Sequence, residues 1–221
     1  MPQTVSEARP HGIERPAAIQ WDAFERAPLM QEPFDHIIVP DFITPEVAVA
    51  AGEAFPRTDL PGVLPAPGDA PGTAFGDILQ ALRSRRTSEA FGEKFGLVLE
   101  PETLMITLRA RTRAMDGRIH TDSETKVVTA LLYLNGDWAD SGGRLRLLRG
   151  PDDIEDMVAE VPPLAGTLLA FRRTSHSWHG HKPFEGERRA IMFNWMVDEA
   201  TARWELRRHA VTSSFKSLFP G

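Results

Sequence analysis

The sequence has 221 residues, with 25 basic and 31 acidic side chains, a formal net charge of −6 and no cysteine. The missing cysteines exclude disulfide scaffolds, thiolate zinc sites, iron–sulfur clusters and cysteine nucleophiles. The acidic balance argues against a general nucleic-acid-binding protein, and no apolar run approaches the roughly 18 residues of a membrane-spanning helix. The first residues also lack the apolar core of a secretory signal, so we expect a cytoplasmic protein with no nucleic-acid or membrane partner.

The N-terminal part of the chain is predicted to be largely helical. In order, we expect a tail (1–33), a short strand (34–39), a first helix beginning at 44, a long loop (56–76) and a second helix (77–95). The pair Thr44-Pro45 has the residue types preferred at the N-cap and first position of a helix. The loop holds five prolines and four glycines. A loop of this kind is either a functional lid or a surface excursion without a task.

From residue 104 onward, apolar side chains alternate with polar ones, which is the period of a β-strand. Strands are predicted within 104–113, 126–135, 142–150, 166–173 and 189–197, followed by a C-terminal helix over 198–217. Short strands separated by turn residues favour a sandwich or a barrel. The predicted fold class is therefore mainly β with supporting helices: one domain over 34–221, with a β core at 104–197 and helices at 44–96 and 198–217.

A possible metal site begins at His120 and Asp122. Side chains two residues apart on an extended chain point the same way, so this imidazole and carboxylate are offered to one point in space. A third imidazole would complete a two-histidine, one-carboxylate set that binds one side of an octahedral Fe(II) and leaves positions open. The candidates for it are His176, His179 and His181. Taken alone, the His-x-Asp triplet is more typical of a turn with a solvated histidine than of a metal site.

Five segments stand in a distinctive order over residues 34–197: FDHIIVPDFITPEVA, HTD, TALLYLNGDWADSGGRLRLL, VPPLAGTLLAF and HGHKPFEGERRAIMFNW. In this order they resemble the Fe(II)- and 2-oxoglutarate-dependent oxygenases of the prolyl-4-hydroxylase-like branch. The resemblance implies a double-stranded β-helix, which is a jelly-roll or cupin-like core. It also implies Fe(II) as cofactor, 2-oxoglutarate and O2 as co-substrates, and hydroxylation of an unactivated C–H bond with production of succinate and CO2.

The resemblance selects His120, Asp122 and His179 as metal ligands, because Pro183 follows His179 at the spacing of the family. No catalytic residue beyond the metal centre is implied. His176 would then be a loop residue.

The resemblance further implies that Arg189 binds the distal carboxylate of 2-oxoglutarate, with Tyr133 and Trp195 beside it. Arg189 shares a strand face with Ile191 and Trp195 by the period of two, so we expect Arg189 to point inward and Arg188 outward. Tyr133 is alternatively a core tyrosine with its hydroxyl at the rim.

The substrate is expected to be a small molecule, an amino acid or a peptide. Arg109, Arg111, Arg118 and His181 are possible substrate-side residues, although the row of arginines is also typical of a solvated edge strand. The oligomeric state is open, with a dimer among the possibilities. Two other functions remain alternatives: a metal-binding cupin-like hydrolase or isomerase, and a non-catalytic module that binds iron and 2-oxoglutarate.

Overall fold

The computed structural model describes residues 18–58, 62–68 and 70–218. Their elements are, in chain order, α1 (Trp21–Arg26), β1 (His36–Val39), α2 (Pro45–Glu53), β2 (Val63–Pro65), α3 (Ala74–Leu82), α4 (Arg85–Phe95), the 3₁₀ turn η1 (Pro101–Thr103), β3 (Leu104–Thr112), β4 (Lys126–Tyr133), β5 (Leu145–Leu148), β6 (Met157–Val161), β7 (Leu168–Arg172), β8 (His179–Gly180), β9 (Gly186–Met196) and α5 (Glu199–Leu218).

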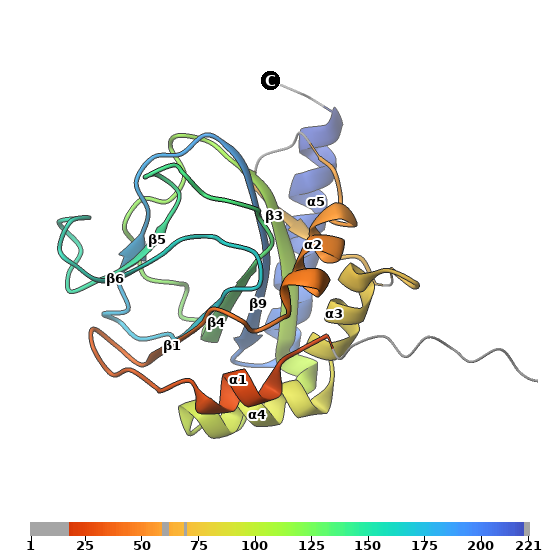
Figure 1. The fold of residues 1–221 in the computed structure, drawn as a ribbon, viewed down its shortest axis with the longest axis horizontal. Coiled ribbons are helices and arrows are strands. Elements are labelled where there is room, and N and C mark those ends of the chain that lie inside the picture. Colours follow the sequence, from red (N-terminus) through yellow and green to blue (C-terminus); the bar gives the residue numbers. More distant parts are fainter. Residues whose placement is uncertain (1–17, 59–61, 69, 219–221) are drawn as a thin grey trace, which may run out of the picture.

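The strands form two antiparallel sheets that face each other (Figure 1). The major sheet has six strands in the order β1-β7-β4-β9-β3-β2, and the minor sheet has three in the order β6-β5-β8. Strands distant in the sequence are neighbours in this arrangement, because β9 pairs with both β3 and β4. The prediction of a mainly β fold with a double-stranded β-helix core is confirmed.

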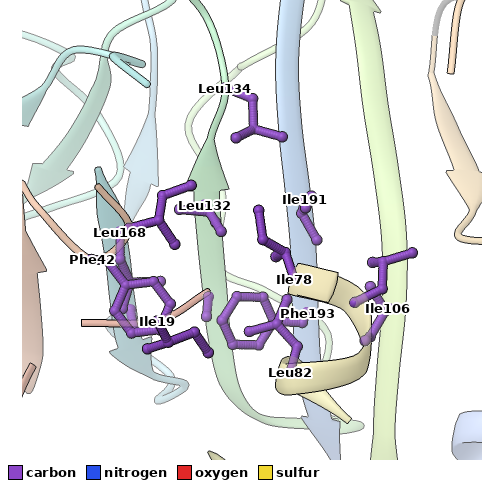
Figure 2. Close-up of a cluster of buried hydrophobic side chains, with 14 of the residues drawn as sticks. Ile19, Phe42, Ile78, Leu82, Ile106, Leu132, Leu134, Leu168, Ile191 and Phe193 are labelled. Atoms are coloured by element: carbon purple, nitrogen blue, oxygen red, sulfur yellow. The ribbon is translucent and has the colours of Figure 1, made fainter. Parts of the chain in front are cut away.

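Each face of the major sheet has its own apolar environment. One face packs against the helices, and Figure 2 shows Ile78 and Leu82 of α3 against Phe193 of β9. The other face turns toward the minor sheet, where Phe171 and Leu147 belong to a second buried cluster. Burial of apolar surface on both faces of the sheet is the main driving force for folding. The space between the two sheets is where a cavity can form.

Helices α2, α3 and α4 begin at hydroxyl N-caps. Thr44 accepts a hydrogen bond from the backbone of Val47, so the predicted start of α2 is confirmed. The single helix predicted over 77–95 is wrong, because Ser84 has an extended backbone, accepts from Thr87 N and caps a new helix. Apolar residues continue at helical spacing on both sides of this break, so the sequence pattern predicted one helix where the structure has α3 and α4.

Residues outside the predicted elements also contribute structure. The predicted tail lies outside the described residues as far as residue 17, but its remainder is not loose, because α1 buries Phe24 and the chain before it buries Ile19. The predicted loop 56–76 contributes strand β2 and the start of α3. Strands β6 and β8 were not predicted, since β8 has only two residues and the short β6 buries only Val161 of its five residues.

Across the part of the chain that the structure describes, no helix combines the length and the apolar character needed to cross a bilayer.

Candidate metal centre and cavity

The side chains of His120, Asp122 and His179 meet at one point between the two sheets. Each offers a ligand atom, and these atoms all lie within 4.8 Å of one another. The backbone makes this meeting possible, because His120 and His179 form an antiparallel bridge with two N–H···O hydrogen bonds of 3.0 Å. Their rings lie 4.4 Å apart between centroids. A short bridge thus joins two chain segments separated by most of the β core.

Backbone carbonyl groups fix the orientation of both imidazoles. Nδ1 of His120 lies 2.8 Å from the carbonyl oxygen of Arg118, and Nδ1 of His179 lies 2.9 Å from that of Ser177. A carbonyl only accepts, so each Nδ1 carries the proton, and the lone pair of each Nε2 is free to bind a metal. Burial lowers the pKa of His179 to about 4, against the opposite effect of Asp122. His179 is therefore neutral, as a metal ligand must be, at physiological pH.

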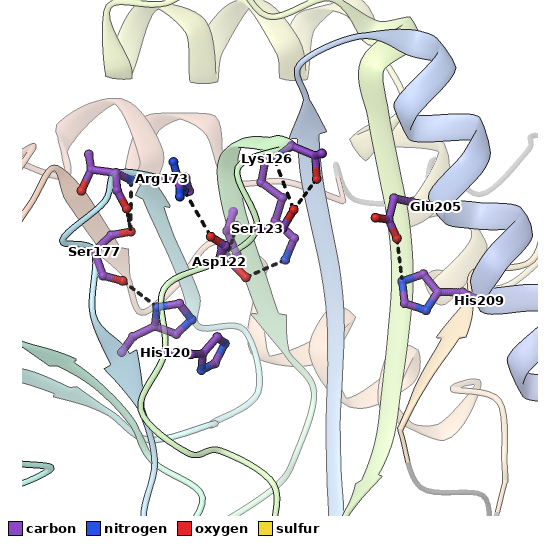
Figure 3. Close-up of polar contacts among 12 residues, drawn as sticks. His120, Asp122, Ser123, Lys126, Arg173, Ser177, Glu205 and His209 are labelled. Atoms are coloured by element: carbon purple, nitrogen blue, oxygen red, sulfur yellow. Dashed lines mark hydrogen bonds and ion pairs between the residues drawn. The ribbon is translucent and has the colours of Figure 1, made fainter. Parts of the chain in front are cut away.

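The carboxylate of Asp122 is held ionised. Its Oδ1 accepts from Nζ of Lys126 at 2.8 Å (Figure 3). Its Oδ2 accepts from the hydroxyl of Thr129 at 2.5 Å. Burial alone would raise the pKa of Asp122, but the charge of Lys126, the nearby His179 and these two hydrogen bonds outweigh it and lower the pKa to about 2. Each carboxylate oxygen keeps a second lone pair, so the group can still bind a cation.

The other two candidate histidines lie elsewhere. His176 is exposed, in the loop before β8. His181 is buried beside Gly117, where its Nδ1 lies 2.8 Å from the carbonyl oxygen of Lys182 and its ring leaves no room for a Cβ on Gly117. In the described residues, the group of His120, Asp122 and His179 is the one in which three potential ligands converge.

A cavity of about 190 Å³ opens beside this group. Its walls come from both sheets and from the segments that join them: Val63, Arg109, Gly117, His120, Asp122, Lys126, Thr129, Leu131, Leu145, His179, Gly180, His181, Arg188, Met192 and Asn194. Most of the polar lining is positively charged or titratable, and most of the apolar lining is aliphatic. Such a mixture suits a small polar ligand that must be oriented within a mostly dry space.

The predicted orientation of the two adjacent arginines is wrong. Arg188 is the inward one: it is only 2% exposed and lines the cavity. Arg189 leaves the opposite face of β9, where its side chain is 31% exposed, donates to the carbonyl of Gly52 at 3.0 Å and pairs with Glu187 at 2.9 Å. The alternation of the strand was read correctly, but the apolar face that Arg189 shares is the face covered by helices.

Trp195 was also placed in the wrong environment. It is buried among aromatic residues of the helix-covered face, with its ring 4.9 Å from that of Phe91, and its indole N–H donates to Ser88 at 3.1 Å. It does not line the cavity. The reason is the same as for Arg189, because the two residues share one face of β9.

Tyr133 does point into the space between the sheets, next to Arg188. Nη2 of Arg188 donates to the phenol oxygen at 3.3 Å, and the guanidinium lies 5.2 Å from the ring centroid. Burial raises the pKa of Tyr133, so its hydroxyl stays protonated. The second clear contact of Arg188 is a hydrogen bond of 2.7 Å from Nε to the carbonyl of Gly143.

The four residues predicted on the substrate side divide into two groups. Arg109 and His181 line the cavity, whereas Arg111 and Arg118 do not. A register shift in the pairing of β3 with β9 between Arg109 and Arg111 breaks the common face on which the row of arginines was predicted.

Sequence reasoning missed several residues of the cavity wall. Lys126 and Met192 were not singled out, and neither was Asn194, which is 2% exposed. Counting in steps of two from Arg188, rather than from Arg189, leads to Met192 and Asn194. The signal was therefore present in the alternation, but the wrong face was taken as the inner one.

Comparisons with known proteins agree with this arrangement. Residues 110–197 match the family model of the 2OG-Fe(II) oxygenase superfamily. Among solved structures, the fold is similar to that of a Pseudomonas putida prolyl-4-hydroxylase, with a TM-score of 0.56 and 21% identity, over 73% of this chain and 92% of that one. It is also similar to a Phytophthora capsici prolyl 4-hydroxylase, with a TM-score of 0.56 and 16% identity, over 85% of this chain and 68% of that one. No curated protein sequence matches this chain.

Proposed function

We propose that this protein, whose residues 110–197 match the 2OG-Fe(II) oxygenase superfamily, hydroxylates an unactivated C–H bond of a small molecule, an amino acid or a peptidyl residue and produces succinate and CO2 from 2-oxoglutarate. In this proposal His120, Asp122 and His179 hold Fe(II), and Arg188 with Tyr133 holds the distal carboxylate of 2-oxoglutarate. Bound Fe(II) supplies the activation of O2, which couples oxidation of the keto acid to that of the substrate.

The donor atoms at the centre fit Fe(II). Two neutral imidazole nitrogens and one carboxylate oxygen, all on one side, are the set that non-haem Fe(II) oxygenases use, with other positions left for co-substrates. The carbonyls of Arg118 and Ser177 aim the imidazoles, and Thr129 aims the carboxylate. Such outer contacts keep ligands in place before the metal binds.

The observation that carries the proposal is the burial of Arg188 without a carboxylate partner. Among the described residues Arg188 forms no ion pair, although it is 2% exposed. A buried guanidinium without an anion is costly, and its planar pair of donors matches a carboxylate. The hydroxyl of Tyr133 accepts from Arg188 and keeps its own proton to donate to the same anion.

This arrangement favours an oxygenase over the alternative of a hydrolase or isomerase. Those reactions have no specific use for a buried cation at a distance from the metal. A dicarboxylic keto acid uses both ends of the cavity, since one end binds the metal and the other end needs a positive charge. Leu131, Leu145 and Met192 contribute apolar surface to the wall of this cavity.

Anaerobic titration with Fe(II) and 2-oxoglutarate tests the proposal. A visible charge-transfer band from iron to the keto acid should appear for the wild type, and succinate should form once O2 is admitted. His179→Ala should lose the band, whereas His176→Ala, a change at an exposed histidine outside the cavity, should keep it. A wild type that binds Fe(II) without this band, or a band that survives in the His179→Ala variant, would contradict the proposal.

A further inference from the structure

A second guanidinium, that of Arg109, reaches the same cavity from strand β3. In the sheet, Ala190 of β9 lies between Tyr133 of β4 and Arg109 of β3, so the two larger side chains flank its methyl group on one rung. Arg188 leans toward Tyr133. Arg109 therefore lies on the side of the cavity away from Tyr133, next to its register partner Val63 on the edge strand β2.

Arg109 has more hydrogen-bond donors than the protein satisfies. Its one side-chain partner among the described residues is Asp116, at 3.4 Å from Nη1. Asp116 is shared, because it also accepts from the backbone and the side chain of Arg113, at 3.0 and 3.3 Å. A guanidinium offers five N–H groups in a planar fork, so most donors of Arg109 have no acceptor in the protein.

The charges around the cavity leave an excess of positive charge near Arg109. Lys126 is paired with Asp122, and the distal carboxylate of 2-oxoglutarate would neutralise Arg188. Arg109 keeps only its shared and long contact with Asp116. Burial lowers the pKa of Arg109, and the charge of Arg188 lowers it further, against the opposite effect of Asp116.

We infer that Arg109 binds a carboxylate group of the primary substrate, so the enzyme acts on an anionic small molecule or on a residue next to a free carboxylate. This inference rests on the proposed function, because it assigns Arg188 to 2-oxoglutarate and leaves Arg109 for the substrate. A bidentate pair from arginine to carboxylate would satisfy the free donors of Arg109 and remove the excess charge.

Matched pairs of ligands test this inference. Each pair consists of an N-acetyl amino acid and its amide, so that the two members differ only in the carboxylate. Binding to the complex of enzyme, Fe(II) and 2-oxoglutarate is followed anaerobically by the change in the charge-transfer band, and coupled succinate release is measured in air. In the wild type at least one carboxylate member should bind about tenfold or more tightly than its amide. A panel in which no carboxylate member binds more tightly than its amide overturns the inference.

Two substitutions separate this inference from the proposed function. Arg109→Gln should remove the preference for the carboxylate member, and Arg109→Lys should restore part of it. The dissociation constant for 2-oxoglutarate should change less than about threefold in Arg109→Gln. Arg111→Gln, at a neighbouring arginine outside the cavity, is the matched control. If Arg109→Gln weakens 2-oxoglutarate instead, Arg109 belongs to the co-substrate and the inference fails, whereas absence of the band in the wild type means that the proposed function itself fails.

Discussion

Arg188 and Arg189 are neighbours in the sequence, yet their side chains lie on opposite faces of β9: Arg188 is in the cavity beside Tyr133, and Arg189 is under the helices beside Gly52. The chain thus offers two arginines one residue apart, of which only one can reach a ligand between the sheets. This relationship allows a direct test with nearly identical substitutions.

Arg188→Met should weaken 2-oxoglutarate binding by about 10- to 100-fold, because a carboxylate loses its charged hydrogen-bond donors. Arg189→Met should change the affinity less than about threefold, since that side chain is engaged with Gly52 and Glu187. Titration of the charge-transfer band measures both. A larger loss of 2-oxoglutarate affinity in Arg189→Met than in Arg188→Met would mean that Arg189 binds the co-substrate, as the sequence analysis predicted.

The convergence of His120, Asp122 and His179 could be predicted from the sequence, because the first two are close along the chain and the third stands at the spacing typical of the family that the chain resembles. His120 and Asp122 are two residues apart on extended chain, which fixes their common direction without further information. The choice of His179 needed the resemblance, since three histidines stand within six residues. The structure brings His179 to His120 through a bridge of two hydrogen bonds, and no local pattern predicts such a long-range pairing.

The arginine assignment failed for a physical reason. Ile191, Phe193 and Trp195 are the most apolar residues of β9, and the most apolar face was taken as the interior of the barrel. In this fold the largest apolar interface lies between the major sheet and the helices, whereas the interior must be polar enough to hold ions. Alternation alone identifies two faces of a strand, but it does not say which layer covers each one.

Thr129→Val should weaken metal binding by about tenfold or more, because Asp122 loses the hydroxyl that aims its carboxylate. The substitution keeps the shape of the side chain. Thr107→Val is the matched control, since Thr107 is also buried on the major sheet but forms no hydrogen bond to a ligand among the described residues. Titration with Mn(II), a redox-stable substitute, measures both affinities, and equal losses in the two variants would mean that Thr129 acts only through packing.

The metal-free protein should lose stability as the pH falls from about 6.5 toward 4. Burial lowers the pKa of His179 and of His181 to about 4, whereas an unfolded chain binds these protons near pH 6.5. The unfolded state therefore holds more protons in this window, and stability present above pH 6.5 is lost on acidification. Each residue contributes roughly 1–3 kcal/mol across the window.

Thermal melting in a chelator at several pH values tests this dependence. His181→Gln should reduce the fall in midpoint between pH 6.5 and 4, because one of the buried imidazoles no longer resists protonation. Asp122 does not contribute to this window, since its pKa is about 2 and its stabilising effect disappears only at lower pH. A midpoint that stays constant between pH 7 and 5 would show that these histidines are solvated in the metal-free protein.

Trp195 distinguishes a core residue from a pocket residue. Its indole N–H donates to Ser88 and its ring packs on Phe91, both of them on α4 behind the sheet. Trp195→Phe and Ser88→Ala should each lower the free energy of unfolding by about 1–3 kcal/mol, because each change deletes one partner of a buried hydrogen bond. Ser88→Ala leaves the buried indole N–H without an acceptor. Its loss of unfolding free energy should therefore be at least as large as the small change in side-chain volume alone would cause.

Neither variant should change the affinity for 2-oxoglutarate more than about twofold, because the face of β9 that carries Trp195 is separated from the cavity by the strand itself. Chemical denaturation and the charge-transfer titration give the two quantities on the same samples. A Trp195→Phe variant with full stability but much weaker 2-oxoglutarate binding would place the indole in the pocket. The faces assigned to Arg188 and Arg189 would then have to be exchanged as well, because all three residues follow one alternation along β9.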